Sequence, residues 1–453
     1  MEIQKFLFYY IIVCIDIQQG LGELGWFWHV TDFHYDFTYQ DRQLSCRGKN
    51  LTDPGKYGDY WCDSPWSLIN SSVYAMAALK PDVDFIIWTG DTVLHGKNQD
   101  LSLDINSGIL KNITFLLKRA FPLKSVFAAY GNHDYWPTDQ FPEGNNELYN
   151  RTLIWWRGWI NDVNEEINFL KGGYYTRLTE SAPKIRILSL NTNLYYFSNK
   201  QTDTLMDPAD QFQWMESVLN GSRVLQEKVI VIAHIPPGVH TPEPVVWMYE
   251  KFNKRLNDIF LKYSDVIVAM HFGHDHADGF KLYLDKAGEP VIPVFIAPSV
   301  TPWRYKQEHN PAIRLVNYDR QTGRHLDINQ YYLDLPEANS QKTAIWKLEY
   351  TAKKHYGVMD LAPSSLLTLM NKMKDYTSDE FQNYFRWTTV NASSTETCNT
   401  DCHVSIICGF SNFDITSYNN CKSKPNSSGS TARKEYLLIA LVVSIIFLQT
   451  RFI

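Results

Sequence analysis

The sequence predicts an α/β protein, and two observations lead to this expectation. Short apolar runs rich in β-branched and aromatic residues alternate along the chain with longer stretches of helical spacing. Several of these apolar runs are followed at once by Asp, Asn or His. Because functional residues of such sheets collect at the carboxyl ends of the strands, these polar side chains are expected to lie along one edge.

The expected strands, in chain order, are 27–31, 84–89, 125–129, 185–190, 228–233, 265–270, 291–297 and 313–318. The expected helices between them are 67–80, 101–120, 147–169, 211–219 and 252–263. Residues 36–66 are aromatic and rich in Gly and Pro, which predicts an ordered surface loop. From about Leu335 the chain favours helices, so we expect a catalytic domain over 23–335 and a small helical subdomain over 336–421.

The stretch 125–134 shows best how a strand end carries chemistry. An apolar run stops at Gly131, where glycine permits a sharp turn, and Asn132 and His133 follow. An amide oxygen can bind a metal, and an imidazole can pass a proton near neutral pH. A Gly-Asn pair alone is usually a turn. It gains weight because other strand ends carry similar residues, namely Asp32, His34, Asp91, His234, His274 and His276.

These strand ends together supply a mixed set of oxygen and nitrogen ligands. Such a set suits zinc, manganese or iron better than calcium or magnesium. Seven ligand positions, one of them shared, match the need of two adjacent divalent ions, whose typical chemistry is displacement at phosphorus. A single histidine of this kind is more often structural, and His29, His240, His271 and Asp36 are expected to be so.

The ordered motifs resemble those of the calcineurin-type metallophosphoesterases. The segments 27–32, 62–65, 88–91, 131–136 and 191–196 are similar to the acid sphingomyelinase-like phosphodiesterases, especially their GPI-anchored members. The resemblance implies a sandwich of two central β-sheets flanked by helices, with a disulfide-linked helical subdomain at the C-terminal end. It also implies two Zn²⁺ ions per chain, with manganese and iron as alternatives.

The resemblance assigns a role to each candidate residue. Asp32, His34 and His276 match ligands of the first zinc; Asn132, His234 and His274 match ligands of the second; Asp91 matches the bridging carboxylate. His133 matches the proton donor to the leaving group, with Asp134 as its expected orienting partner, and His95 matches a phosphate-contacting residue. A hydroxide bridging the two ions would attack phosphorus in line.

Several functions remain open at this point. Nucleotide-type phosphodiesters or phosphoanhydrides are favoured over phospholipid head groups, because the saposin domain of acid sphingomyelinase does not precede the first strand. A non-catalytic surface protein that modulates membrane lipids or receptors is the alternative, although no metal ligand is missing. A phosphomonoesterase of the purple-acid type would need a tyrosine beside Asp91, where Thr92 stands. The net charge of -6 gives no support to a nucleic-acid polymer as partner, and a monomer is expected.

Residues 1–22 have the pattern of a signal peptide, with a hydrophobic segment from Phe6 to Ile15 and small residues near the end of the pattern. A buried N-terminal element is the alternative. Without Cys14 an even number of cysteines remains, which favours disulfides. Sequence proximity suggests the pairs Cys46–Cys62, Cys398–Cys402 and Cys408–Cys421, although pairing within the last four is undetermined. Glycosylation sequons stand at Asn50, Asn70, Asn112, Asn150, Asn220, Asn391 and Asn426.

The C-terminal end predicts a GPI anchor on the extracellular face of the plasma membrane. Residues 422–435 form a polar stalk, with the attachment region at Asn426, Ser427, Ser428 and Gly429, and 436–453 form a hydrophobic tail. The apolar run from Tyr436 to Leu448 would reach only about 20 Å as a helix, against a hydrocarbon core of about 30 Å. A single-pass membrane protein and a secreted protein are the alternatives.

Overall fold

The computed structural model describes residues 24–424 except 47–51, 53, 182, 305–306 and 393–396. The signal segment, the sequons at Asn50 and Asn426, the attachment region and the hydrophobic tail therefore lie outside the described residues. Among the described helices, none combines the length and the apolar character that a membrane span requires.

The first sheet is six-stranded, in the order β14-β13-β12-β1-β2-β3. Its parallel half is β1 to β3, and the other strands run antiparallel to their neighbours. The parallel strands are almost wholly buried and apolar, as expected of strands covered on both faces. The strands are β1 (Leu24–Val30), β2 (Phe85–Trp88), β3 (Ser125–Ala128), β12 (Ala312–Asp319), β13 (His325–Leu333) and β14 (Trp346–Thr351).

The second sheet is also six-stranded, in the order β10-β11-β9-β6-β5-β4. Its central strands are parallel, and an antiparallel strand closes each edge. The strands are β4 (Tyr175–Leu178), β5 (Arg186–Ser189), β6 (Val229–Ile232), β9 (Ile267–Phe272), β10 (Gly279–Leu284) and β11 (Pro290–Ile296). A separate hairpin consists of β7 (Val239–His240) and β8 (Val245–Val246).

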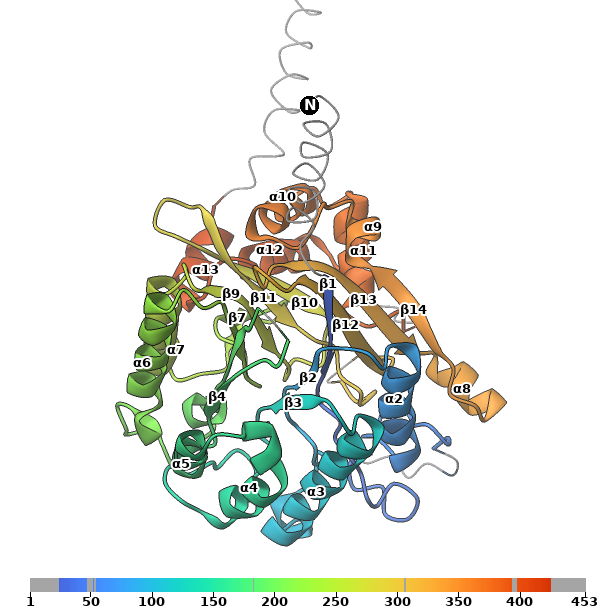
Figure 1. Ribbon diagram of the computed structural model, residues 1–453. Coiled ribbons are helices and arrows are strands. Elements are labelled where there is room, and N and C mark those ends of the chain that lie inside the picture. The colour runs from blue at the N-terminus through green and yellow to red at the C-terminus, as the bar shows by residue number, and fades with distance from the viewer. Residues whose placement is uncertain are drawn as a thin grey trace, which may run out of the picture.

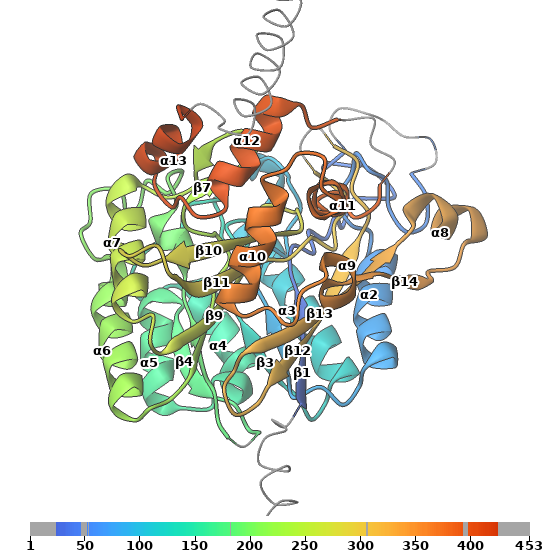
Figure 2. The same cartoon turned by 90° about the horizontal axis from the view of Figure 1, so that it is seen from above.

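The two sheets pack face to face around one continuous apolar core. Ser189 of β5 donates a hydrogen bond to the carbonyl of Ala128 of β3, 2.9 Å away. Helices cover the outer faces: α6 and α7 lie on one side of the molecule and α2 on the opposite side (Figures 1 and 2). The predicted sandwich of two sheets flanked by helices is therefore confirmed.

A row of buried histidines also joins the sheets. His271 of β9 lies between His29 of β1 (Nδ1 to Nδ1, 3.3 Å) and His325 of β13 (Nε2 to Nε2, 2.7 Å). His325 Nδ1 donates to the carbonyl of Gly323 at 3.1 Å, which leaves its Nε2 to accept from His271. His271 Nδ1 then accepts from His29, whose Nε2 lies 3.1 Å from Thr89 Oγ1 and accepts from it. Every nitrogen has a partner when all three rings are neutral.

The helices of the catalytic half are α2 (Trp66–Leu79), α3 (Leu103–Ala120), α4 (Glu147–Ile160), α5 (Val163–Gly172), α6 (Gln211–Val224) and α7 (Glu250–Lys262). The continuous helix expected over 147–169 is in fact two. Asn161 ends α4 in a left-handed conformation, and Asp162 caps the next helix by accepting from the backbone of Asn164 and Glu165.

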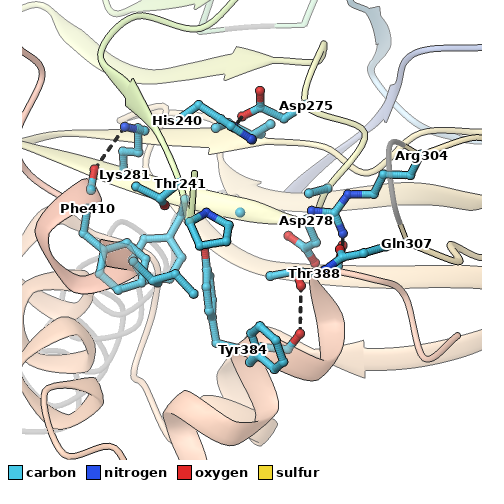
Figure 3. A pocket seen from close by; sticks show the side chains of 18 residues that line it. His240, Thr241, Asp275, Asp278, Lys281, Arg304, Gln307, Tyr384, Thr388 and Phe410 are labelled. Carbon is cyan, nitrogen blue, oxygen red and sulfur yellow. Dashed lines mark hydrogen bonds and ion pairs between the residues drawn. The ribbon is translucent and has the colours of Figure 1, made fainter. Parts of the chain in front are cut away.

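The C-terminal region holds α8 (Leu335–Gln341), α9 (Ala352–Tyr356), α10 (Pro363–Met373), α11 (Asp379–Trp387), α12 (Thr400–Gly409) and α13 (Ile415–Lys422). The sequence predicts helices alone after Leu335, but β14 lies here and extends the first sheet. The region also contacts the second sheet: Lys281 of β10 donates to the carbonyl of Gly409, 3.0 Å away (Figure 3). The C-terminal helices therefore pack directly on the catalytic half.

Candidate metal centre

The ends of five parallel strands meet at one edge of the sandwich. Strand β1 leads to Asp32 and His34, β2 to Asp91, β3 to Asn132, β6 to His234, and β9 to His274 and His276. The structure brings all seven predicted ligands together there. Most of their side chains are fully buried, so the polar atoms must find partners among themselves or in a bound ion.

The first group of donor atoms surrounds His34 Nε2. It lies 3.6 Å from Asp32 Oδ1, 3.4 Å from Asp91 Oδ2 and 3.1 Å from His276 Nε2. His276 Nε2 in turn lies 3.4 Å from Asp32 Oδ1. Ligand atoms around a tetrahedral zinc lie about 3.3 Å apart, since zinc to nitrogen distances are about 2.0 to 2.1 Å. The spacing of this group fits one metal ion.

The second group surrounds His234 Nε2. It lies 3.1 Å from Asp91 Oδ2, 3.0 Å from Asn132 Oδ1 and 3.2 Å from His274 Nδ1. His274 Nδ1 lies 2.9 Å from Asn132 Oδ1. These separations fit the edges of a second coordination tetrahedron. The same oxygen of Asp91 belongs to both groups, as a bridging ligand must.

Hydrogen bonds behind the rings decide which nitrogen faces each site. The Nδ1 atoms of His34, His234 and His276 donate to the backbone carbonyls of Val93 (2.8 Å), Thr89 (2.7 Å) and Trp303 (2.6 Å). Each ring is thereby held in the tautomer whose Nε2 lone pair points into the cluster.

The oxygen ligands are oriented in the same way. Asp32 Oδ2 accepts from Thr31 Oγ1 and the backbone of His274, while its Oδ1 is buried and, within the described part of the chain, has no hydrogen-bond partner. Asp91 Oδ1 accepts from the backbone of His133 at 2.8 Å, which leaves Oδ2 for both sites. Asn132 Nδ2 donates to Asp139, so its oxygen faces the cluster. A buried unpaired carboxylate oxygen among imidazole lone pairs fits a bound cation.

The backbone at the ligands is unusual. Asp32, His34, Asp91, His274 and His276 all adopt positive φ angles between 41° and 72°, a region that costs free energy for residues with a Cβ atom. The strand ends also approach each other closely. A Cβ atom on Gly131 would lie 2.0 Å from Asp91 Oδ1, so only glycine allows this approach.

The charges of the cluster favour a cation. Burial opposes ionisation of the Asp32 carboxyl, but the neighbouring His276 holds its pKa well below the usual range. Burial likewise opposes protonation of His234, yet the Asp91 carboxylate raises the pKa of that imidazole to about 9. The carboxylates therefore stay ionised and attract positive charge, which a divalent ion supplies when protons leave the rings.

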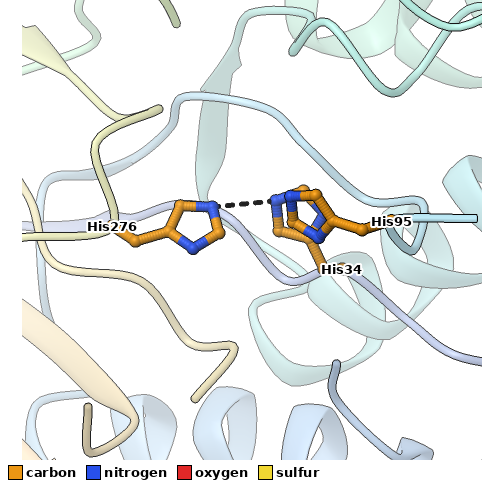
Figure 4. A group of neighbouring side chains, drawn as sticks. All are labelled: His34, His95 and His276. Atoms are coloured by element: carbon orange, nitrogen blue, oxygen red, sulfur yellow. Dashed lines mark hydrogen bonds between the residues drawn. The ribbon is translucent and has the colours of Figure 1, made fainter. Parts of the chain in front are cut away.

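His95 lies beside the first group of ligands. Its ring stacks on His34, with centroids 4.1 Å apart, and on Trp303, with centroids 3.8 Å apart. Figure 4 shows His95 beside His34, while His276 approaches His34 from the other side. His95 Nδ1 lies 3.0 Å from Asp63 Oδ1, and this buried carboxyl also accepts from the backbone of His95 at 2.6 Å. Asp63 thus fixes the ring, a contact that sequence reasoning missed although the Cys62–Pro65 motif stood out.

His133 lies next to the bridging carboxylate. Its ring centroid is 4.4 Å from that of His95, and its Nδ1 is buried without a hydrogen-bond partner among the described residues. Burial lowers the pKa of His133 to about 4. The expected pairing of His133 with Asp134 is wrong. Asp134 accepts instead from the backbone of Gly131 (2.7 Å) and Thr92 (2.8 Å), which ties the ends of β2 and β3 together.

A cleft of about 710 Å³ opens over the cluster. Asp91, His95, Asn132, His133, His274 and His276 lie on its floor and walls. Aromatic side chains add apolar surface to it, namely Tyr196, Trp247 and Trp303. His240 also lines the cleft, and its Nδ1 lies 2.9 Å from Asp275 Oδ2. The volume suits a small organic phosphate.

The disulfides Cys46–Cys62, Cys398–Cys402 and Cys408–Cys421 are formed as suggested. Of the sequon asparagines that the structure describes, Asn112, Asn150, Asn220 and Asn391 are exposed and Asn70 is half-buried.

Comparisons with known proteins agree with this geometry. Residues 25–278 match the calcineurin-like phosphoesterase family, and residues 289–427 match the acid sphingomyelin phosphodiesterase C-terminal region. The human cyclic GMP-AMP phosphodiesterase SMPDL3A is 42% identical over 409 residues, covering 88% of this chain and 90% of that protein. The human acid sphingomyelinase-like phosphodiesterase 3b is 38% identical over 415 residues, with 88% and 90% covered. Sphingomyelinase phosphodiesterase C of Dictyostelium discoideum is 33% identical over 397 residues, with 83% and 87% covered.

Proposed function

Because the chain belongs to the calcineurin-like metallophosphoesterases, and among them to the acid sphingomyelinase-like phosphodiesterases, we propose that it hydrolyses nucleotide-type phosphodiesters or phosphoanhydrides at a di-zinc centre. As a member of this family it is a phosphoric diester hydrolase. The proposed di-zinc centre rests on the two four-atom ligand groups, which share one oxygen of Asp91.

The residues present fit two divalent ions. Asp32, His34 and His276 would hold one, Asn132, His234 and His274 the other, and Asp91 both. Bound there, the ions would supply Lewis-acid charge for the phosphoryl oxygens and an activated water as nucleophile. Imidazole and carboxylate ligands favour zinc, and also accept manganese or iron.

The chain's own side chains complete the reaction. His133, held beside Asp91 through its backbone, is placed to give its proton to the oxygen that leaves phosphorus. His95 is placed to contact a phosphoryl oxygen, and Asp63 and Trp303 keep its ring in position. The bond from phosphorus to the leaving oxygen breaks as the water oxygen adds. The water releases one proton to solvent, and His133 takes up one from solvent to complete the cycle.

The cleft and the relatives support the proposed substrate class. Three aromatic side chains lie within reach of the cluster, and flat bases stack well on such surfaces. The SMPDL3A relatives are named for the hydrolysis of cyclic GMP-AMP. Hydrolysis of cyclic GMP-AMP, ATP, CDP-choline and sphingomyelin by the zinc-loaded protein tests the proposal, with Asp91→Asn as the inactive control. Preference for sphingomyelin over every nucleotide would overturn the substrate assignment.

We also propose that the protein reaches the cell surface through the secretory pathway. Three disulfides and four exposed sequon asparagines support this route. A cleaved signal at 1–22, N-glycans, and a GPI anchor at 426–429 are the expected modifications. A monomer remains the expected state.

A further inference from the structure

The hairpin of β7 and β8 forms one wall of the substrate cleft. Its residues on the cleft are His240, Pro242, Glu243, Pro244, Val245 and the adjoining Trp247. Two of them reach the metal centre through one carboxylate: His240 Nδ1 lies 2.9 Å from Asp275 Oδ2, and Trp247 Nε1 donates to Asp275 Oδ1 at 2.9 Å. Asp275 stands between the ligands His274 and His276, so these two contacts tie the hairpin to the ligand loop.

The other side of this hairpin rests on the C-terminal helices. Ser405 of α12 donates its hydroxyl to the carbonyl of Pro242, and Val239 shares a small apolar cluster with Cys408 and Tyr418. Gly409 packs so closely that a Cβ atom there would lie 2.5 Å from Thr241 Cγ2. The C-terminal helices thus support one wall of the cleft, although none of the seven candidate metal ligands lies on them.

Lys281 joins these two parts. Its side chain is buried, and its Nζ donates to the carbonyl of Val239 in the hairpin at 2.6 Å and to that of Gly409 at 3.0 Å. Gly409 is the last residue of α12, where the helix dipole places negative charge. Figure 3 shows Lys281 next to Phe410, to the left of the His240–Asp275 pair. Burying a charged amine costs free energy unless the amine is hydrogen-bonded. The buried Lys281 therefore favours the arrangement in which both carbonyl groups stay in contact with its Nζ.

We propose that Lys281 is a positioning residue for the substrate: it fixes the hairpin against α12 and so sets the affinity of the cleft. This inference rests on the proposed phosphodiesterase function. No metal ligand touches Lys281 among the described contacts, and the reacting groups lie on other strands. Its loss is therefore expected to change substrate binding and to leave metal binding and the chemical step intact.

The test is Lys281→Met in the whole protein expressed through the secretory pathway, since methionine keeps the apolar stem and removes the donors. Loss of a hydrogen bond from a charged donor typically shifts the equilibrium that it supports by about tenfold or more. We expect KM for bis(p-nitrophenyl) phosphate and for cyclic GMP-AMP to rise about three- to tenfold, with kcat and metal content unchanged. Hydrogen exchange should quicken at residues 239–247. Lys118→Met is the matched control, because Lys118 donates to the carbonyl of Trp155 and neither residue lines the cleft.

A fall in kcat with unchanged KM, or unchanged exchange of the hairpin, would overturn the proposal. Ser405→Ala removes the neighbouring contact with Pro242 and should shift KM in the same direction; if Lys281→Met does not fold, this variant decides the matter. If the wild-type protein hydrolysed none of these substrates, the proposed function would fail, and the exchange measurement would still decide whether Lys281 holds the hairpin.

Discussion

Replacement of Asp91 by asparagine is the sharpest test of the two-metal centre. The change keeps the volume and the hydrogen bond from His133, but it neutralises the one oxygen that lies 3.4 Å from His34 and 3.1 Å from His234. Loss of a group behind a metal ligand already weakens binding by about 10- to 100-fold. Loss of a direct ligand should cost each ion at least about 100-fold, or roughly 3 kcal/mol.

The assay is metal content after dialysis, together with titration against a chelator of known affinity. Asp36→Asn is the matched control, because Asp36 is buried in the segment that follows β1 and, among the described residues, its carboxylate accepts from Thr38 and Ser45 rather than facing the ligand cluster. We expect the control to keep two ions per chain and the Asp91 variant to lose both, along with activity. Two tightly bound ions and normal turnover in Asp91→Asn would refute the bridging role.

Further predictions concern the general acid, the buried histidines and the anchor. His133→Ala should slow cleavage of poor leaving groups far more than of nitrophenyl esters, because only the former need a proton; equal losses would remove His133 from that role. The pKa of His133 is lowered to about 4, so its protonated fraction should grow up to tenfold for each pH unit as pH falls from 7 toward 4. The ratio of the rate with a poor leaving group to the rate with a good one should rise by the same factor. The pH dependence of the nucleophile affects both rates equally and cancels in this ratio. Burial lowers the pKa of His325 from 6.5 to about 4. Between these pH values the unfolded chain binds more protons than the folded chain, so the free energy of unfolding falls as pH drops from 6.5 to 4. His325→Gln should flatten that fall by up to about 3 kcal/mol in urea unfolding, and an unchanged slope would contradict the neutral histidine row. Phosphatidylinositol-specific phospholipase C should release the cell-surface protein, and a tag after Ile453 should be missing from it; a retained tag on lipase-resistant protein would indicate a transmembrane anchor.

The cluster of candidate metal ligands could be predicted because its signal is local. Each ligand follows an apolar strand by two to four residues, so the sequence shows both the strand and its polar end. The partner of His95 could not be derived in this way. Asp63 belongs to a loop, and only the folded chain brings it to a ring 32 positions away.

The strand β14 was within reach of sequence reasoning. Trp346, Leu348 and Tyr350 alternate with Lys347 and Glu349, the period of a half-buried strand. The helical composition around it concealed this short signal. The contact of His240 with Asp275 could not be predicted, because it depends on how the hairpin folds over the ligand loop.

The position of β1 has a consequence for the order of folding. The strand that carries Asp32 and His34 pairs on one side with β2 but on the other with β12, where Leu24 lies opposite Asp319. During synthesis, one edge of β1 must therefore wait without its partner until most of the chain has been made. An open strand edge invites pairing with other chains, and such long-range pairing forms slowly. Asp32 and His34 follow this strand directly, so we expect their part of the ligand cluster to reach its final geometry only after this late pairing.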